Sequence, residues 1–259
     1  NNFTMATYKK RGAKKSIAPS KQTEVIEEST TAEVFETLDT TASRTEEWVV
    51  KYQNVILTVI GVVAVGVLGY LGYQNFVTKP KAQEAISELN QAQYYFELAV
   101  NSVNGDSLYR RALNGGEGKY GFLDIISNYK GTPAAKLATY SAGMAYLNLK
   151  DYTNAIQYLD QFSSEDILLG ALSKGAIGDA FAQLGQPNDA YDYYVAASKI
   201  NNNDYSTPKY LYKAAMIGSE IGKNSQALSF LKRIEKEFPE SNEASLVAVQ
   251  IAKLETLLQ

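Results

Sequence analysis

The sequence predicts an all-α protein in which a single N-terminal transmembrane helix is followed by a solenoid of paired helices. Two observations lead to this prediction. Residues 55–73 form a run of nineteen residues without one charge, and from Lys119 onward small and large residues recur at intervals of 35 and 37. A third observation limits the chemistry, because the 259 residues include no cysteine and no histidine.

The uncharged run, Val55–Tyr73, predicts a membrane-spanning helix. At about 1.5 Å of rise per residue it would extend roughly 28 Å, close to the hydrocarbon thickness of a bilayer. A signal peptide has a shorter apolar core close to the N-terminus, whereas more than fifty residues precede this run, and we expect Met5 to be the natural start. Trp48 and Tyr52 before the run suit a membrane interface, so we assign the transmembrane helix to 48–77.

Four glycines lie within this predicted span. Small residues allow close approach of helices in lipid, and a spacing of three residues would form a smooth groove for another helix. An equally open alternative is that glycine is merely tolerated in lipid. The candidate helix-packing residues are Gly61, Gly66, Gly69 and Gly72.

Residues 1–47 are polar and predict a disordered cytoplasmic tail, since they offer little apolar surface to offset chain entropy. A short amphipathic helix could form over 32–38. The basic residues next to the span are balanced, two on each side, but six more in the tail favour a cytoplasmic N-terminus. These six are Lys9, Lys10, Arg11, Lys14, Lys15 and Lys21.

Residues 78–132 predict N-terminal helices and a degenerate first repeat. A new helix is expected to start at Pro80 and continue over 81–100, and a short helix is expected over 106–113. The glycine-rich segment 114–118 lacks the spacing of a phosphate-binding loop and is interpreted as a connector. The half-unit 119–132 is expected to pair with the 81–100 helix.

The periodic positions of residues 133–259 resemble those of the tetratricopeptide repeat. Small residues recur at Gly143, Gly178 and Ala215 and at Ala155, Ala190 and Ala227; larger ones recur at Leu159, Tyr194 and Leu231. The resemblance implies helix–turn–helix units, with turns near 151, 186 and 223, whose small residues lie where two helices cross. Gly218 departs from the pattern, since an aromatic residue is usual there. A final capping helix is expected, with an apolar face formed by Leu246, Val249, Leu254 and Leu257.

The same resemblance implies ligand contacts on the first helix of each pair. The alternative is that these side chains form the core between neighbouring pairs. The candidate partner-binding residues are Tyr140, Met144, Asn148, Asp179, Gln183, Tyr212, Met216 and Glu220.

Composition argues against catalysis. Without histidine the commonest general base and metal ligand is missing, and the carboxylates mostly fall at expected helix starts, where they favour the helix dipole. A net charge of −3 does not suggest a nucleic-acid partner. We therefore expect no enzyme activity, no cofactor, no metal and no small-molecule substrate.

The layout as a whole is similar to the YfgM type of bacterial inner-membrane protein. This resemblance implies an ancillary subunit of the SecYEG translocon, with a periplasmic repeat domain that docks a PpiD-like membrane-anchored chaperone or emerging secretory chains. A competing interpretation is a scaffold for cell-envelope or secretion-system assembly that does not bind the Sec channel. A third is a structural homo-oligomer that associates through the glycine-lined span.

Overall fold

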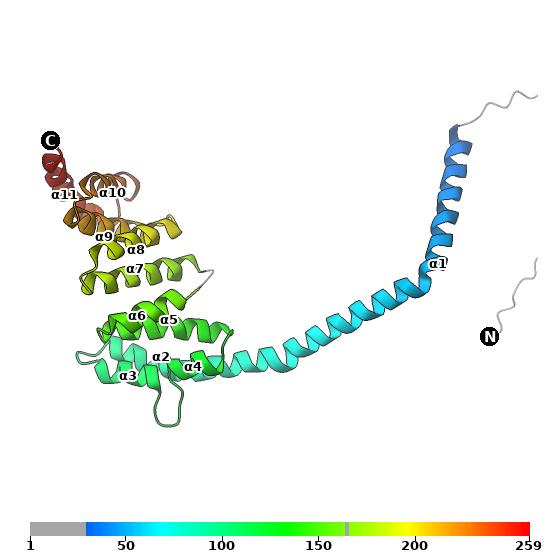
Figure 1. Ribbon diagram of the computed structural model, residues 1–259, viewed down its shortest axis with the longest axis horizontal. Coiled ribbons are helices and arrows are strands. Elements are labelled where there is room, and N and C mark those ends of the chain that lie inside the picture. The colour runs from blue at the N-terminus through cyan, green and yellow to red at the C-terminus, as the bar shows by residue number, and fades with distance from the viewer. Residues whose placement is uncertain (1–29, 164–165) are drawn as a thin grey trace, which may run out of the picture. The chain divides into compact units, whose positions relative to one another are not determined.

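The computed structural model describes residues 30–163 and 166–259, and within these ranges all regular secondary structure is helical (Figure 1). The only extended pairing there is an isolated bridge between Gly116 and Lys119. The protein divides into two units, residues 1–67 and 68–259, which are described separately. The all-α prediction is confirmed.

The first helix, α1 (Thr30–Tyr73), carries the apolar run. Its mean hydropathy reaches 2.4 and none of this stretch is buried, so the helix is long and apolar enough to cross a membrane. The rings of Trp48 and Tyr52 are 5.4 Å apart at one end of the run. A Cβ added at any of the four glycines of the run would meet no atom within 4 Å.

The start of α1 differs from the sequence prediction, because residues 30–47 are helical where a disordered tail was expected. No glycine or proline occurs between Thr30 and Ile60. Extending a helix costs much less than nucleating one, so the apolar helix continues into this polar segment. Residues 1–29, with the basic cluster, lie outside the described residues, and disorder there stays a prediction.

Pro80 lies in the first turn of the next helix, as predicted, but the chain does not break before it. One π-helical turn, η1 (Gln74–Thr78), joins α1 to α2 (Lys79–Val100) without a break. The Lys79 backbone N–H donates to the carbonyl of Gln74, five residues back rather than four. Proline cannot donate to the carbonyl four residues before it and would clash with it, and a wider turn accommodates both constraints.

The helix α2 packs mainly on α3 (Asp106–Asn114) and on the repeat that follows. The buried face of α2 consists of Ala85, Leu89, Ala92, Tyr95 and Ala99, and Phe96 packs partly buried beside it. The half-unit is α4 (Phe122–Asn128), which contacts α2 less extensively than α3 does. The half-unit therefore contacts α2, as expected, but the main partner of α2 is α3.

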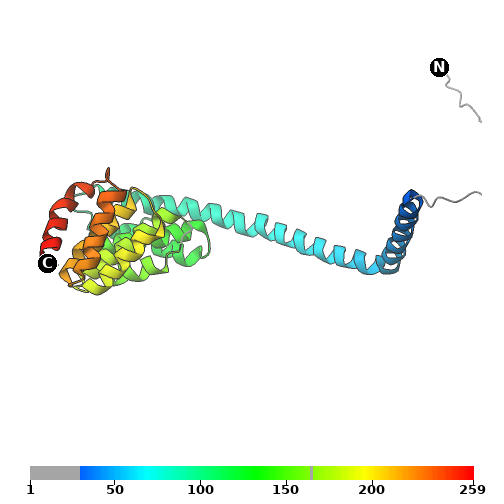
Figure 2. The same ribbon diagram turned by 90° about the horizontal axis from the view of Figure 1, so that it is seen from above.

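Three helix pairs and one final helix follow, stacked in sequence order as Figure 1 shows; Figure 2 looks along this stack, so the helices overlap there. The pairs are α5 (Pro133–Asn148) with α6 (Tyr152–Gln161), α7 (Ile167–Gln183) with α8 (Pro187–Ile200), and α9 (Ser206–Glu220) with α10 (Asn224–Glu237); the final helix is α11 (Ala244–Leu257). This arrangement confirms the predicted tetratricopeptide-like solenoid.

The turn inside each pair has one geometry, which confirms the three predicted turns. In each, a residue with positive φ follows the first helix, and the next N–H donates to a carbonyl five residues back. The positive φ values are 60° at Lys150, 71° at Gly185 and 78° at Gly222. The three bonds join Asp151 to Tyr146 (2.9 Å), Gln186 to Phe181 (2.9 Å) and Lys223 to Gly218 (2.7 Å).

Two acidic residues at helix starts act as caps. The Asp151 carboxylate accepts from the N–H of Asn154 at 3.3 Å. The Asp166 carboxylate accepts from the N–H groups of Leu168 and Leu169 at 2.9 and 3.0 Å. Side-chain acceptors at this position satisfy N–H groups that have no partner within the helix. Both carboxylates therefore have a structural role, as their positions in the sequence indicated.

The small residues lie where the two helices of a pair cross. A Cβ added at Gly143 would lie 2.5 Å from Cγ of Leu159, and one added at Gly178 would lie 2.7 Å from Cδ1 of Tyr194. Such distances are too short for any real Cβ, so the close approach of the helices in the first two pairs depends on glycine. This confirms the crossing expected from the periodicity.

The unusual glycine of the third pair has a specific partner. In the first two pairs an aromatic residue on the first helix packs on one from the second helix, Tyr146 on Tyr158 and Phe181 on Tyr193. In the third pair, Gly218 leaves this space open, and Tyr191 from the preceding pair fills it. The Tyr191 ring lies 6.3 Å from that of Phe230, and a Cβ on Gly218 would be 3.0 Å from Tyr191 Cε2.

The apolar face predicted for the final helix is largely wrong. Of its four residues only Leu254 is buried, whereas Leu246, Val249 and Leu257 are exposed by 51%, 75% and 59%. The buried face consists of Val247, Ile251 and Leu254, which pack on the core of the third pair. The helix carries two apolar stripes, and contact with α10 and α9 selects the one that is buried.

Candidate protein-binding groove

A polar groove crosses the three helix pairs. It has a volume of about 460 Å³ and is formed by the last turns of α5 and α7, by α9, and by single residues of α6, α8 and the first turn. We define the groove by its polar lining residues, which are Asn148, Lys150, Tyr152, Asp179, Gln183, Tyr194 and Lys213. Two apolar residues, Leu147 and Ala182, complete it.

The Asp179 carboxylate is the central group of the groove. One of its oxygens, Oδ1, accepts a hydrogen bond from the Tyr194 hydroxyl at 2.6 Å and contacts Lys213 Nζ at 2.5 Å. The Lys213 ammonium also lies 5.4 Å from the centroid of the Tyr194 ring. Asp179 and Lys213 are one third exposed, at 37% and 33%, so water reaches one side of the pair. The contact joins the second helix pair to the third.

Burial raises the pKa of Tyr194 far above its ordinary value of 10, and its hydrogen bond to Asp179 raises it further. The phenol therefore stays protonated and keeps donating to the carboxylate. Tyr210 stacks on Tyr194 with ring centroids 6.4 Å apart, and burial raises its pKa as well. Gly175 makes room for Tyr210, because a Cβ there would lie 2.0 Å from Cε1 of the ring.

Two amides occupy the last turns of neighbouring first helices. Asn148 ends α5 and Gln183 ends α7, and both side chains are exposed. Asn148 Nδ2 donates to the carbonyl of Met144 at 2.8 Å, and the Tyr152 hydroxyl donates to Gln183 Oε1 at 3.5 Å. Each amide keeps further donor or acceptor capacity beyond these bonds.

The groove contains three of the eight candidate partner-binding residues, namely Asn148, Asp179 and Gln183. Four others are half-buried between helix pairs. Tyr140, whose ring is 5.2 Å from that of Phe162, and Met144 pack beside the core around Leu159, and Tyr212 and Met216 pack on the core around Leu231. Glu220 is exposed at the end of α9.

Sequence reasoning missed four groove residues, Lys150, Tyr152, Tyr194 and Lys213. One signal was present for Lys213. It follows Asp179 by 34 residues, about one repeat, and carries the opposite charge. That spacing puts the two residues on neighbouring first helices, where an ion pair can form.

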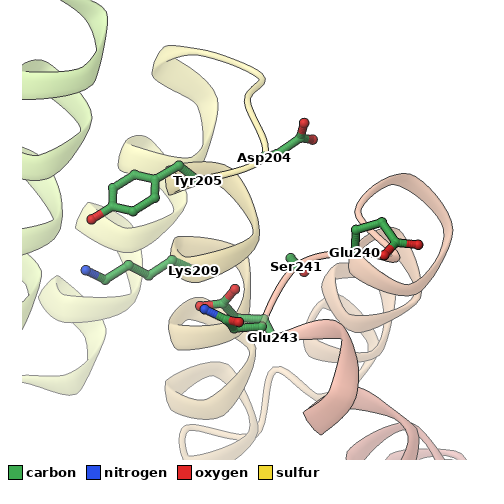
Figure 3. A pocket seen from close by; sticks show the side chains of 7 residues that line it. Asp204, Tyr205, Lys209, Glu240, Ser241 and Glu243 are labelled. Atoms are coloured by element: carbon green, nitrogen blue, oxygen red, sulfur yellow. The ribbon is translucent and has the colours of Figure 1, made fainter.

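A second hollow of about 380 Å³ lies between the start of α9 and the loop before α11 (Figure 3). It is lined by Asp204, Tyr205, Lys209, Glu240, Ser241, Asn242 and Glu243. In Figure 3 the Tyr205 and Lys209 side chains point away from those of Asp204 and Glu240. No group of three acidic residues suited to a metal ion occurs in the part of the protein that the structure describes. The Ser241 hydroxyl accepts a hydrogen bond from the N–H of Ala244, the first residue of α11, at 3.2 Å.

Comparison with curated proteins gives no match to this protein. Residues 138–164 match the model of the tetratricopeptide repeat family. The matched segment covers most of α5, all of α6 and the turn between them, which provide Asn148, Lys150 and Tyr152 of the groove. Tetratricopeptide repeats are typically protein-interaction modules rather than catalytic ones. The protein thus contains a tetratricopeptide repeat, and the helix pairs α7–α8 and α9–α10 continue its architecture.

Proposed function

We propose that this protein is a non-enzymatic, membrane-anchored scaffold that holds a protein partner in the groove defined above. The observation that carries the proposal is the continuous polar groove across three successive helix pairs, centred on Asp179 and Lys213. A surface built by several repeats can contact an extended partner at several points, which is how solenoids use their size.

The apolar part of α1 supports the anchor, because none of it is buried in the protein and it is long enough to span a bilayer. The basic residues of the tail favour a cytoplasmic N-terminus, so the repeat domain lies on the opposite side. In a bacterial inner membrane this side is the periplasm. The four glycines of the span are available for packing against another membrane helix, since a Cβ added at each would meet no atom of the described residues within 4 Å.

Within this class of scaffold, the layout favours an ancillary subunit of the SecYEG translocon. The similarity to YfgM-type proteins rests on one N-terminal span, an aromatic first helix and degenerate repeats. The groove would then dock a PpiD-like periplasmic chaperone or emerging secretory chains. A scaffold for envelope or secretion-system assembly is the competing outcome of the test below.

The residues of the groove also favour binding over catalysis. Its only carboxylate is engaged by Tyr194 and Lys213, and the sequence has no histidine or cysteine to serve as base or nucleophile. Amides, a tyrosine hydroxyl and an exposed lysine form the rest of its polar lining. These groups can hydrogen-bond a partner without reacting with it.

Site-specific photocrosslinking in bacterial membranes tests the proposal. A photoreactive residue replaces Gln183 in the groove or, as a matched control, Gln157, which is exposed on α6 and outside the groove. The proposal expects Sec channel subunits or a membrane-anchored chaperone to be crosslinked from position 183 and not from position 157. Recovery of envelope machinery alone would refute the translocon role, and equal products at both positions would refute the groove. Recovery of the protein in the aqueous fraction after membranes are sedimented would refute the anchor.

A further inference from the structure

The second unit of the protein begins within the apolar run, at Leu68, and includes the helix that follows it. Residues 68–100 form one continuous helix, in which the turn η1 joins the end of α1 to α2. The direction of the last turns of the run relative to the helix pairs is therefore set within this unit. Apolar side chains stay exposed on this helix as far as Phe76 and Val77, and the first charge is Lys79. The edge of the hydrocarbon core therefore belongs near Val77.

The packed part of the repeat domain starts close to that edge. Ala85 is the first buried residue of α2, and it follows Val77 by eight residues, or about 12 Å of helix. The headgroup layer occupies about 5–8 Å on each side of the hydrocarbon core. Only about 5 Å then separates the headgroups from the first packed residues, and long side chains can cover that distance.

One edge of the solenoid lies on the side of the span. Tyr129 ends α4 and contacts α2 near its start, where burial and a hydrogen bond with Glu84 raise the pKa of Tyr129 to about 12. The helix α5 begins just after this contact, and α7 and α9 begin on the same side of the stack, as Figure 1 shows. The connections between pairs therefore lie toward the span, and the turns within pairs, which border the groove, lie at the opposite edge.

The connections between pairs present apolar and aromatic side chains beside mixed charges. Leu168, Ile200 and Tyr205 are exposed there, and a Cβ added at Gly170 would lie 3.8 Å from Ile200, so Ile200 lies against the start of α7. Tyrosine is favoured at membrane interfaces. Nearby charges have both signs, so attraction to anionic lipid is weak. We define the connection edge by these residues: Leu168, Lys199, Ile200, Asp204, Tyr205 and Lys209.

We propose that the connection edge lies on the headgroup region of the bilayer, with Leu168, Ile200 and Tyr205 in contact with zwitterionic lipid. The proposal rests on the membrane anchor of the proposed function and adds a lipid surface as a second partner of the repeat domain. Because the continuous helix holds this edge toward the bilayer, the turns that border the groove face the aqueous side. A protein partner then reaches the groove without displacing lipid.

Tryptophan fluorescence of the full-length protein in lipid nanodiscs tests the proposal. Trp48 is the single tryptophan, so Trp48→Phe gives a background in which one new tryptophan reports on its own surroundings. In this background Leu168→Trp places the probe on the connection edge. Leu184→Trp, at the other end of α7, is the matched control, since the two leucines are exposed by 40% and 43%. The nanodiscs contain phosphatidylcholine with or without a nitroxide on its headgroup, which quenches tryptophan at short range.

The Leu168→Trp variant should lose at least about half of its fluorescence to the nitroxide lipid, and the Leu184→Trp variant less than about a tenth, because about 24 Å of helix separates the two positions. Tyr205→Trp is a second probe of the connection edge and should be quenched as strongly as Leu168→Trp. Adding anionic lipid or salt should change the quenching by less than about a fifth. Circular dichroism at 222 nm checks that each variant keeps its helix content.

Two results would overturn the proposal. Equal quenching at positions 168 and 184 would mean that the connection edge does not face the bilayer. Quenching at positions 168 and 205 that requires anionic lipid and disappears with salt would mean that charge, rather than apolar contact, holds the edge. Trp48 of the unmodified protein tests the anchor separately, since its quenching by the same lipid requires an inserted span. The lipid contact can therefore fail while the anchor and the scaffold function stand.

Discussion

Moving the aromatic side chain from position 191 to position 218 would test how the third helix pair is packed. Tyr191 is only 7% exposed, and its ring occupies the space that an aromatic side chain at Gly218 would fill. Lys223 Nζ lies 4.0 Å from the centroid of the same ring. The double variant Tyr191→Ala, Gly218→Phe would move the aromatic side chain back to the first helix of its own pair, opposite Phe230.

The structure sets the size of each effect. Tyr191→Ala removes a buried ring and should cost about 3–5 kcal/mol of unfolding free energy. Gly218→Phe alone places a Cβ about 3.0 Å from Tyr191 Cε2 and should cost about 1–3 kcal/mol by overpacking. If the two changes were independent, the double variant would lose about 4–8 kcal/mol. Because the new phenylalanine fills the vacated space, we expect the double variant to recover about 2 kcal/mol or more of that sum.

Thermal unfolding of the full-length protein in detergent, followed by circular dichroism at 222 nm, measures these effects. For a domain of this size 1 kcal/mol corresponds to about 2–4 °C, so Tyr191→Ala should lower the apparent Tm by about 6–20 °C. Tyr94→Ala is the control, since that ring is 54% exposed and its loss should shift Tm by only about 1–2 °C. A double variant as unstable as the sum of the two single variants would refute the assignment of Tyr191 to this space.

Three further predictions concern turns, close contacts and pH. Lys150→Gly should raise the unfolding free energy by about 1 kcal/mol, because Lys150 has a φ of 60° that glycine adopts without strain; an unchanged Tm would contradict this. Gly175→Ala should lower stability by about 1–3 kcal/mol through its clash with Tyr210, whereas Gly170→Ala in the same helix, with its nearest atom 3.8 Å away, should be neutral or slightly stabilising by the same thermal assay. The raised pKa values of Tyr194 and Tyr210 mean that above pH 10 the unfolded protein loses protons that the folded protein keeps. Stability should therefore be full below pH 10 and fall above it by up to about 1.4 kcal/mol per pH unit for each tyrosine, and Tyr210→Phe should make urea unfolding curves less steeply dependent on pH in that range.

Local signals in the sequence were sufficient to predict the solenoid but not to predict which face of every helix is buried. The turns could be predicted because glycine, proline and polar residues recur midway through each unit. The buried side of α11 could not, because the helix has one apolar stripe at Val247, Ile251 and Leu254 and another at Leu246, Val249 and Leu257. Both stripes have helical spacing, and only the position of the preceding pair decides which one is buried.

The junction at Pro80 shows a similar limit. Proline usually begins a helix, which favoured a break before it. The protein instead widens a single turn, and the Lys79 N–H bonds five residues back. This alternative costs little when the preceding helix is already formed, because no new nucleus is needed. A rule based on residue type alone does not consider that extending an existing helix avoids the free-energy cost of nucleating a new one.

Only part of the groove could be predicted from the sequence, because residues at one periodic position have two different structural roles. Met144, Asp179 and Met216 each follow the small crossing residue of their pair, so the periodicity treats them alike. Both methionines pack half-buried between helix pairs, where a flexible apolar side chain fills the gap. A carboxylate at the same place cannot be buried without a partner, and Asp179 finds two, Tyr194 from its own pair and Lys213 from the next. Of the three helix pairs, only the second has a charged residue at this position, where the other two have methionine. The polar centre of the groove therefore lies in the second pair. Replacing Asp179 by methionine should therefore convert the groove floor into ordinary core and leave the fold intact. Crosslinking of the partner from position 183 should then become more sensitive to salt through the unpaired Lys213, and crosslinking with unchanged salt dependence would contradict this account.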